Sequence, residues 1–376
     1  MEGKGGKAMS NNLDTLVTSI NKKYGDWTIR SAGEYPILRR ISTGIFALDA
    51  GIGGGVPKGR ICIFAGNESA GKTTVAKLTM AQFQNTCKGC LLPLNDCTCE
   101  NKEPHKAVFI DMEGAFDAQW FKTLGGNVED LLLIQPEFAE QAVDIAEALI
   151  RSSEVDILVV DSIAMLSPAD EIEKSSEDLL VGTHARLMNR MMRSIQSGMN
   201  SLGMSTQRKP SVILINQIRS KIGVMFGDTT TYPGGLGQKF ASSITVRFTA
   251  RPSERIYKDT TKKEDLVAVQ IRFHVEKNKT FTPHQNGMFT LYVNNSDHGE
   301  KGAVNNEDQV VAYATKYGVI EKSGAWLNYK GEKYQGKTHL VDALIDDVEL
   351  LEELKMYTLE KVKGVVTGVE EDNDEE

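Results

Sequence analysis

The sequence predicts an α/β fold built on a mainly parallel sheet. Three observations carry this prediction: apolar runs alternate with helical patterns, the first run leads into a glycine-rich loop, and a helical pattern follows that loop. Apolar runs of this kind are typical of strands that are buried on both faces, and their alternation with helices favours a parallel arrangement. Five runs qualify: residues 61–65, 107–111, 131–134, 157–161 and 212–215.

The first element expected along the chain is a helix over residues 10–25. Leu13, Leu16, Val17 and Ile20 recur at the spacing of one helix face, and Gly25 ends the pattern. The residues before it are rich in Gly and Lys, so we predict no secretory signal. No stretch reaches the about 18 apolar residues that indicate a membrane span. We therefore expect a cytoplasmic protein.

The strongest motif is the glycine-rich loop that follows the first strand. Residues 66–73 match G-x-x-x-x-G-K-[ST], a loop that binds phosphate with its backbone N–H groups and with the start of the next helix. Lys72 would reach the β- and γ-phosphates, and the Thr73 hydroxyl would bind Mg²⁺. The candidate nucleotide-binding residues are Gly66, Asn67, Glu68, Ser69, Ala70, Gly71, Lys72, Thr73 and Thr74. A glycine-rich turn without a ligand is the alternative.

Four of the five cysteines lie together after this helix. They are Cys87, Cys90, Cys97 and Cys99. In a reducing cytosol such a cluster indicates a metal site before disulfides, and four thiolates at CxxC…CxC spacing suit a tetrahedral structural Zn²⁺. His105 is a possible substitute ligand. A surface loop with reduced cysteines, or with a disulfide, is the alternative; Cys62 lies in a predicted strand and is expected in the core.

Acidic residues lie at or just after the ends of two predicted strands. Asp161 ends the run at 157–161, where a P-loop protein places its second metal-binding residue. Glu113 follows the strand at 107–111 and could orient water on the γ-phosphate. Asp111 competes for that role, and a solvated loop carboxylate is the default interpretation of Glu113 from the pattern alone.

The pattern changes beyond residue 240. Segments 244–251, 267–275 and 288–293 follow one another without helices, which predicts antiparallel strands that extend the sheet. A more polar C-terminal part predicts a small α+β domain with an acidic tail. The organisation expected is an N-terminal helix and linker (1–41), a core (42–294) with an insertion (87–105), and a C-terminal domain (295–376).

The net charge of −8 argues against a simple nucleic-acid coat. Much of the acidic excess lies in the tail at 371–376, however, and Arg208, Lys209, Arg219 and Lys221 form a basic segment. The overall charge therefore does not exclude DNA binding.

Taken together, the motifs resemble those of the bacterial RecA recombinases. Segments 66–74, 109–117, 159–162 and 215–219 occur in the order of that family, and 221–227 is nearly identical to its DNA-contacting loop. The resemblance covers about residues 10–345 with one insertion, and it is loose at 252–265 and 295–315. It implies a RecA-like P-loop NTPase core that uses ATP and Mg²⁺ for DNA strand exchange, with DNA-stimulated ATP hydrolysis.

The resemblance also assigns roles around the ATP site. Glu113 would activate water, and Gln217 would sense the γ-phosphate and pass that state to the loop after it. Lys277 and Lys279 resemble lysines that reach into the neighbouring subunit's ATP site, in the manner of an arginine finger in trans. Such a head-to-tail contact implies a helical filament, with the N-terminal helix docked on the adjacent subunit.

Two residues resemble those that hold adenine. Trp120 falls where the family usually has a stacking tyrosine, and Asp117 would contact the adenine edge. The indole of Trp is larger than the ring of Tyr. A core aromatic is the alternative for Trp120.

Two loops, at about 173–182 and 219–235, match those that contact DNA in the family. Phosphate contacts hold a strand without reading its sequence, as a homology search requires. The residues expected at the DNA backbone are Arg186, Asn189, Arg193, Arg219, Ser220, Lys221, Gly234 and Gly235. Ile222 and Phe226 could brace stacked bases. Val181 stands where the family often has Met.

The resemblance implies single- and double-stranded DNA as partners, a helical homo-oligomer, and cooperation with single-strand-binding and mediator proteins in DNA repair and the SOS response. Two other functions stay open. A hexameric helicase of the same fold is disfavoured by segment 221–227, and an ATP-binding DNA filament without turnover is disfavoured by Glu113. The insertion and the divergent tail leave room for a bacteriophage-encoded member.

Overall fold

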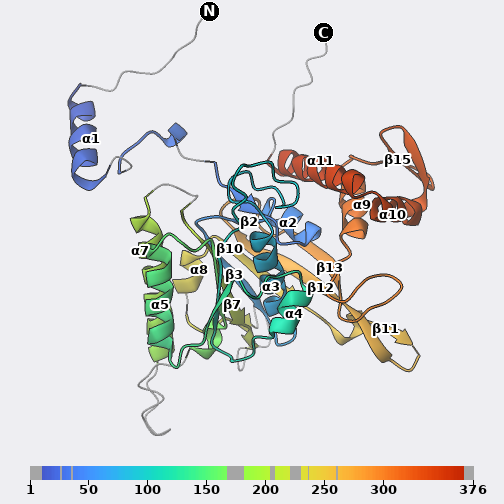
Figure 1. The fold of residues 1–376 in the computed structure, drawn as a ribbon, viewed down its shortest axis with the longest axis horizontal. Helices are drawn as coiled ribbons and strands as arrows, with labels where there is room; N and C mark the ends of the chain where they lie inside the picture. Colours follow the sequence, from blue (N-terminus) through green and yellow to red (C-terminus); the bar gives the residue numbers. More distant parts are fainter. Residues whose placement is uncertain are drawn as a thin grey trace, which may run out of the picture.

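A nine-stranded sheet forms the centre of the molecule (Figure 1). The computed structural model describes residues 11–25, 28–34, 37–166, 182–203, 208–220, 230–235, 237–259 and 261–367. The strand order is β5-β4-β6-β7-β3-β10-β12-β11, and β13 also pairs with β12. The strands are β3 (Ile61–Gly66), β4 (Ala107–Asp111), β5 (Leu131–Ile134), β6 (Ile157–Asp161), β7 (Ser211–Gln217), β10 (Ile244–Thr249), β11 (Arg255–Asp259), β12 (Glu264–Asn278) and β13 (Asn286–Tyr292).

The half of the sheet from β5 to β10 is parallel, which confirms the α/β class predicted from the alternating pattern. The antiparallel extension is formed by β11, β12 and β13. One expectation was wrong. Strand β10 pairs antiparallel with β12 but parallel with β3, because the chain returns through α8 (Gly237–Ala241) to the amino edge before it enters β10. The change of direction therefore comes one strand later than predicted.

Helices cover both faces of the sheet. The side chains of β3 alternate between them: Cys62 and Phe64 belong to one buried cluster, and Ile61 and Ile63 to the other. The first cluster includes residues of α2 (Phe46–Ile52), α3 (Lys72–Gln84) and α4 (Ala118–Thr123), and the second includes residues of α5 (Ala139–Arg151) and α7 (Thr183–Ser201). The helices are drawn on opposite sides of the strands in Figure 1. Cys62 lies in the core, as expected.

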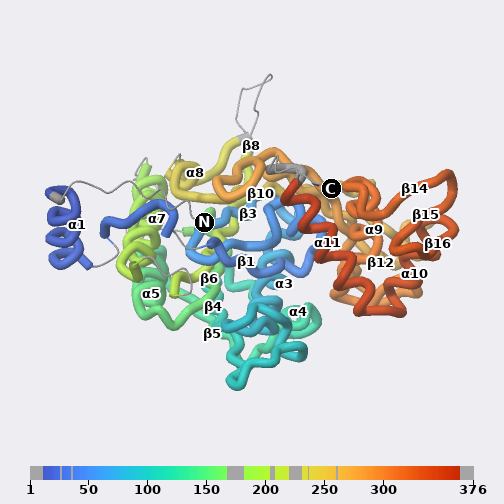
Figure 2. The backbone as a smooth tube through the Cα atoms, turned by 90° about the horizontal axis from the view of Figure 1, so that it is seen from above, coloured from blue at the N-terminus to red at the C-terminus, as the bar shows by residue number. Residues whose placement is uncertain are grey.

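The C-terminal elements have a hydrophobic cluster of their own. They are α9 (Asn306–Lys316), β14 (Glu321–Ser323), β15 (Trp326–Tyr329), β16 (Glu332–Gln335), α10 (Gly336–Asp346) and α11 (Val348–Thr367). The three strands form an antiparallel sheet. Phe46 of α2 joins this cluster and packs edge-on against Tyr313, which ties the C-terminal part to the core. Figure 2 shows these elements at one end of the molecule.

Helix α1 (Asn11–Tyr24) stands at the opposite end, away from the sheet (Figures 1 and 2). Leu13 and Leu16 are exposed on it. The described residues also form two short antiparallel strand pairs. Strand β1 (Arg40–Ile41) pairs with β2 (Val56–Pro57), and β8 (Arg219–Ser220) pairs with β9 (Thr230–Thr231). Among the described helices, none has the length and apolarity to cross a membrane.

Candidate functional site

The glycine-rich loop joins β3 to α3 at the carboxyl edge of the parallel strands. Gly71 precedes α3 with a φ of 85°, and a Cβ there would come within 2.5 Å of Ile271 Cδ1. A Cβ on Gly66 would lie 2.5 Å from the carbonyl oxygen of Phe248. The path of the backbone therefore requires glycine at both positions. It directs the N-terminal amides of α3 toward the loop, where they can receive an anion.

Lys72 is the first residue of α3 and is largely buried. Its Nζ donates to the carbonyl oxygen of Asn67 at 2.6 Å, so the ammonium is held across the loop. Burial lowers the pKa of Lys72, and the nearby charges of Asp161 and Glu113 oppose that change.

Thr73 and Asp161 lie in direct contact below the loop. The Thr73 hydroxyl donates to Asp161 Oδ2 at 2.6 Å, although the two residues come from different elements, α3 and the end of β6. Burial, together with the charges of Glu113 and Asp111, raises the pKa of Asp161 to about 6. A hydroxyl beside a buried carboxylate that is repelled by other carboxylates is a donor set that suits a divalent cation.

Glu113 and Gln217 lie together next to this pair. Gln217 ends β7, and its Nε2 donates to Glu113 Oε1 at 3.3 Å. Asp111 is placed differently. It is buried, and its carboxylate accepts hydrogen bonds from three backbone amides of residues 113–116 and from Gln135 Nε2. Asp111 thus shapes the loop that carries Glu113, while Glu113 itself is exposed.

Trp120 and Asp117 lie beside the P-loop helix. Asp117 caps α4 by accepting from the Trp120 amide at 2.9 Å, and the Trp120 indole N–H donates to Thr74 Oγ1 at 3.4 Å. Lys301 Nζ lies 5.7 Å from the centre of a Trp120 ring. Trp120 is half-buried, so one part of its ring system packs and another part stays open.

A pocket of about 250 Å³ beside the loop contains residues that the sequence did not single out. Val269 and Ile271 of β12 and Leu291 of β13 line it, together with Val293 and residues of the loop. Sequence patterning had predicted strands here. It could not show that they lie beside the P-loop, because that depends on the order of strands in the sheet.

Lys277 and Lys279 lie away from the chain's own P-loop. The register pairs Lys277 with Thr245 and Thr245 with Ile63, whereas the loop begins at Gly66. Both lysines donate to carbonyl oxygens of α8: Lys277 to Lys239, and Lys279 to Phe240 at 3.0 Å. Burial, and then the charge of Lys279, lowers the pKa of Lys277 to about 8.

The expected DNA contacts fall partly outside the described residues. Lys221, Ile222, Phe226 and most of the first loop, 173–181, lie there. In the described part, Arg186 and Arg193 are exposed on α7, and Asn189 is half-buried. Arg219 and Ser220 form β8, which pairs with β9.

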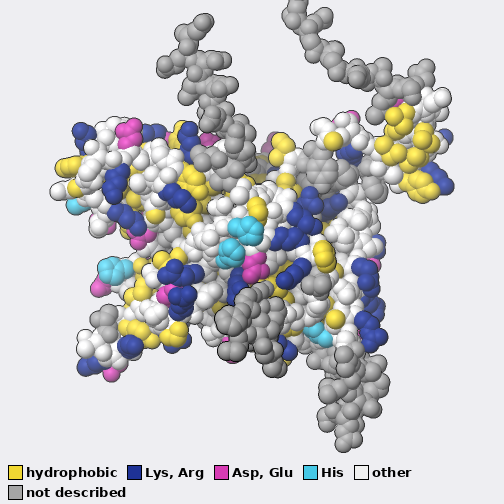
Figure 3. Space-filling view, turned by 180° about the vertical axis from the view of Figure 1, so that it is seen from behind, with side chains coloured by type: hydrophobic (Ala, Val, Ile, Leu, Met, Phe, Trp, Pro, Cys, Tyr) yellow, Lys and Arg dark blue, Asp and Glu magenta, His cyan; other side chains and the backbone are white. Residues whose placement is uncertain are grey.

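The segment that follows β9 lies against α7. Built Cβ atoms on Gly234 and Gly235 would contact Met188 and Ala185 of that helix. The structure thus brings the end of the second loop beside the helix that follows the first. Figure 3 shows Lys and Arg side chains spread widely over one face of the molecule, with few acidic side chains among them.

The four clustered cysteines converge in the insertion. One sulfur from each of Cys87, Cys90, Cys97 and Cys99 lies within 4.8 Å of all the others, and none forms a disulfide. Cys90 and Cys97 Sγ are 3.5 Å apart. Hydrogen bonds from backbone amides, that of Cys90 foremost, lower the pKa of Cys87 to about 6. His105, the suggested substitute, is not in this group: its ring packs on Phe83, with centres 5.5 Å apart.

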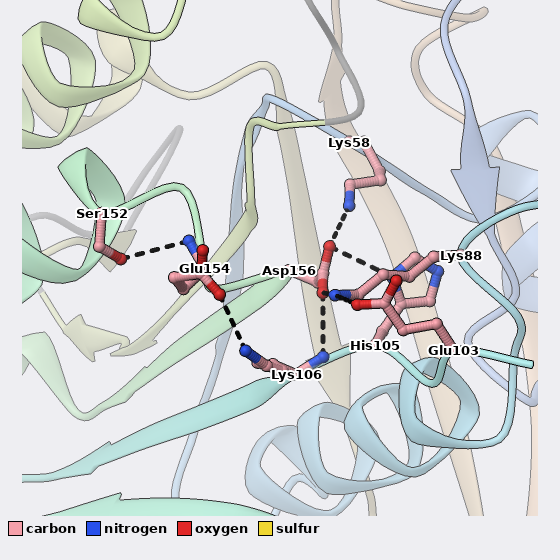
Figure 4. Close-up of polar contacts among 8 residues, drawn as sticks. All are labelled: Lys58, Lys88, Glu103, His105, Lys106, Ser152, Glu154 and Asp156. Carbon is pink, nitrogen blue, oxygen red and sulfur yellow. Dashed lines mark hydrogen bonds and ion pairs between the residues drawn. The ribbon is translucent and has the colours of Figure 1, made fainter. Parts of the chain in front are cut away.

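The insertion is docked on the amino edge of the sheet by Asp156, the residue before β6 (Figure 4). Asp156 Oδ1 lies 2.6 Å from Lys58 Nζ and 3.3 Å from His105 Nδ1. Its Oδ2 lies 3.1 Å from Lys88 Nζ and accepts from the Lys106 amide at 2.9 Å. Lys88 lies at the start of the insertion, and His105 and Lys106 lie at its end. The buried carboxylate of Asp156 therefore contacts both ends of the insertion.

Comparison with known proteins finds matches over most of the chain. The model of the RecA N-terminal domain covers residues 11–296, and that of the RecA C-terminal domain covers residues 308–363. "Protein RecA" of Bacillus mycoides (strain KBAB4) is 36% identical over 367 residues, 96% of each chain. "Protein RecA" of Oceanobacillus iheyensis is 37% identical over 359 residues, 93% of each chain, and that of Mesomycoplasma hyopneumoniae (strain 7448) is 34% identical over 355 residues, 93% of this chain and 95% of that one.

Proposed function

The chain belongs to the RecA family, and from that membership we propose how its residues divide the work. It is an ATP-dependent DNA recombinase and a DNA-dependent ATPase that uses Mg²⁺ and forms filaments on DNA. The observation that carries the residue assignment is the contact of Gln217 with Glu113, next to the Thr73–Asp161 pair. These four side chains come from β7, the loop after β4, α3 and β6, and they lie at the end of the glycine-rich loop.

Thr73 and Asp161 are the proposed holders of Mg²⁺. Support comes from their 2.6 Å contact and from the raised pKa of Asp161, because a cation would relieve the repulsion among the carboxylates. When bound, the ion supplies neutralising charge to the phosphates of ATP. Lys72 and the amides at the start of α3 hold those phosphates in place.

Glu113 is the proposed base or water-orienting group, and Gln217 the proposed sensor of the γ-phosphate. Glu113 is exposed and carries no structural bonds of the kind that occupy Asp111, which supports the first choice. The bond from Gln217 to Glu113 supports the second. A γ-phosphate that took over the amide of Gln217 would release Glu113 toward water and pull on the end of β7.

Lys277 and Lys279 are proposed to complete the ATP site of a neighbouring subunit. Their position at the other end of the β3 register from the P-loop supports action in trans rather than in cis. Each would place positive charge against the transferring phosphoryl group. The exposed Leu13 and Leu16 on the outlying α1 support the docking of that helix on an adjacent subunit.

Asp117 and Trp120 are proposed to receive the adenine, beside the pocket lined by Val269 and Ile271. The indole bond to Thr74 supports this choice, because it fixes the ring next to the loop. For DNA, the exposed Arg186 and Arg193, with Asn189, Arg219, Ser220, Gly234 and Gly235, are the proposed backbone contacts. Lys221, Ile222 and Phe226 complete the proposed set.

The cysteine cluster is proposed to hold a structural Zn²⁺. Thiolates of a tetrahedral site with Zn–S distances of about 2.3 Å lie about 3.8 Å apart. The separations of 3.5 Å to at most 4.8 Å in this chain bracket that value. The four cysteines would brace the insertion, and the ion would take no part in ATP chemistry.

Metal analysis of the purified chain tests the zinc site. About one zinc per chain is expected, and Cys90→Ser should lose it. Cys62→Ala is the matched control, because it removes a core thiol outside the cluster. Retention of full zinc by Cys90→Ser, or no zinc in the wild type, would overturn the assignment.

The recombinase assignment is tested by strand exchange between circular single-stranded and linear duplex DNA with ATP. Joint molecules are expected for the wild type. Glu113→Gln should lower DNA-stimulated phosphate release by at least about a hundredfold while it still binds DNA. Glu129→Gln, an exposed carboxylate outside the site, is the control. Wild-type hydrolysis by Glu113→Gln would contradict the role given to that residue.

The wider setting is proposed on family membership alone. It comprises action in the cytoplasm, cooperation with single-strand-binding and mediator proteins, and a part in the SOS response. The proposed division into 1–41, 42–294 and 295–376 has the support of the separate C-terminal cluster.

A further inference from the structure

Residue Glu276 is the extra residue of a β-bulge in β12. The register of β10 with β12 passes from Thr245 opposite Lys277 to Val246 opposite Val275, so Glu276 has no partner in the ladder. Along a regular strand, neighbours point to opposite faces. Here Glu276 and Lys277 both line the same cavity, of about 340 Å³, because a bulge re-aims side chains.

The end of the second DNA loop lines the other side of this cavity. Tyr232, which comes directly after β9, donates its hydroxyl to Glu276 Oε2 at 2.5 Å. The second carboxylate oxygen of Glu276 lies 3.7 Å from Arg247 Nη1 on β10. A neutral hydroxyl bonded to a carboxylate is a charge-assisted bond, stronger than a neutral pair.

Two further contacts give a second route from Tyr232 to Lys277. Lys239 Nζ lies 5.4 Å from the centre of the Tyr232 ring, and the carbonyl oxygen of Lys239 accepts from Lys277 Nζ. Tyr232 is thus linked to Lys277 along two routes: through Glu276, its chain neighbour, and through Lys239. Displacement of Tyr232 can therefore reach the Lys277 side chain through the backbone of Glu276 and of Lys239.

The same segment is also tied to β7. The carbonyl oxygen of Pro233, next to Tyr232, accepts from Asn216 Nδ2 at 3.3 Å, and Asn216 precedes Gln217. The end of the DNA loop is therefore joined to the chain's own ATP site through β7 and to the lysine pair through Glu276.

We propose that the Tyr232–Glu276 bond positions Lys277 in response to DNA, so that loading of the second loop sets the reach of this lysine into the neighbouring ATP site. This rests on the proposed function, which gives residues 219–235 to DNA and Lys277 to the neighbour. Neither Tyr232 nor Glu276 is among the residues proposed to contact DNA or ATP. They are positioning residues for hydrolysis.

Tyr232→Phe tests the link, since it keeps the ring over Lys239 and removes only the hydroxyl. The kcat of DNA-stimulated ATP hydrolysis should fall by about tenfold, while the KM for ATP and the affinity for single-stranded DNA stay within about twofold. DNA affinity is measured with a fluorescent oligonucleotide and a non-hydrolysable ATP analogue. Tyr257→Phe, on β11, is the matched control and should keep the wild-type kcat.

Glu276 gives the second pair of variants. Glu276→Gln keeps an acceptor for the Tyr232 hydroxyl and should retain more activity than Glu276→Val, which removes it. Because both residues act through one bond, Tyr232→Phe combined with Glu276→Val should be no slower than the slower single variant. Additive losses, an unchanged kcat in Tyr232→Phe, or kcat and DNA affinity that fall together would overturn the link.

The two levels of inference fail in different ways. A wild-type chain without DNA-stimulated hydrolysis contradicts the proposed function. A stimulated wild type with an equally stimulated Tyr232→Phe contradicts only the link.

Discussion

The two ends of β6 carry aspartates in opposite situations. Asp161 ends the strand at the carboxyl edge, where burial and the charges of Glu113 and Asp111 raise its pKa to about 6. Asp156 precedes the strand at the amino edge. Burial alone would raise its pKa, but His105 and Lys58 hold that pKa well below its ordinary value. One carboxylate is short of positive charge, and the other is surrounded by it.

This difference separates a site built for a ligand from one built for the fold. A carboxylate that is poorly compensated costs stability and attracts a cation. A carboxylate held by two lysines and a backbone amide contributes stability and needs no further partner. Burial alone does not distinguish them, since both aspartates are buried; the charges around each one do.

The largest effect is expected for Asp161→Asn. Hydrolysis should fall by at least about a hundredfold, because the metal loses a charged ligand. At pH 7 the free energy of unfolding should rise by up to about 2 kcal/mol, because an uncompensated buried charge disappears. Phosphate release and urea unfolding measure the two quantities. A loss of stability above about 2 kcal/mol would show that Asp161 is structural, like Asp156.

Asp156→Asn should give the reverse result. Loss of the Asp156 charge leaves Lys58 buried without a counter-charge, which should lower the free energy of unfolding by about 3 kcal/mol. Hydrolysis per folded molecule should stay within about twofold, because the residue lies at the other edge of the sheet. Urea unfolding and phosphate release at low temperature, where the variant is folded, provide the check. Unchanged stability would break the comparison.

The pH dependence of stability should differ in sign between the two residues. The folded pKa of Asp161 is raised from 3.8 to about 6, so its favourable contribution is present below pH 3.8 and lost as the pH rises through 6. The folded pKa of Asp156 is lowered, so its contribution is present above the ordinary value of 3.8 and lost as the pH falls.

Unfolding of the wild type and Asp161→Asn at pH 4 to 7 measures the first of these contributions. The advantage of the variant should grow with pH, by on the order of 2 kcal/mol in total. Saturating Mg²⁺ and ATP should reduce it. An advantage that shrinks as the pH rises would contradict the assignment of a raised pKa to Asp161.

The smallest effect is expected for Glu154→Gln. Glu154 lies near Asp156 and pairs with Lys106 at 2.9 Å, but both side chains are mostly exposed. Water screens such an exposed pair, so this variant should unfold at nearly the wild-type urea concentration and serves as the control for Asp156→Asn. A cost comparable to that of Asp156→Asn would mean that position near the amino edge, rather than burial of the carboxylate, decides the energy.

Much of the fold could be predicted because its signals are local. The strand at 157–161 follows from an unbroken apolar run and the helix at 10–25 from helical spacing, and they agree with β6 and α1. The direction of β10 could not be predicted, because it depends on which strand accepts its hydrogen bonds. Short α4 was missed, since six residues hold too little periodicity.

In the candidate site, too, the features with local signals could be predicted and those that depend on distant contacts could not. The loop at 66–73 is contiguous, so its spacing alone identifies it. The contact of Gln217 with Glu113 joins two distant segments and depends on strand order. The bulge at Glu276 has no sequence signature, because Glu on a strand is ordinarily a solvated residue. Asp156 was not recognised either; the charges that surround it come from three separate segments.

Strand β12 runs from Glu264 to Asn278, and its length has a consequence for assembly. Val269 and Ile271 line the pocket beside the P-loop, where adenine is proposed to bind, and Lys277 is proposed to serve the ATP site of a neighbour. Each subunit then carries complementary halves of two different sites. A row of n subunits contains n−1 complete sites, so an isolated subunit has none and hydrolysis per subunit should rise as rows lengthen. The rate law of hydrolysis should therefore include the number of subunits in the row.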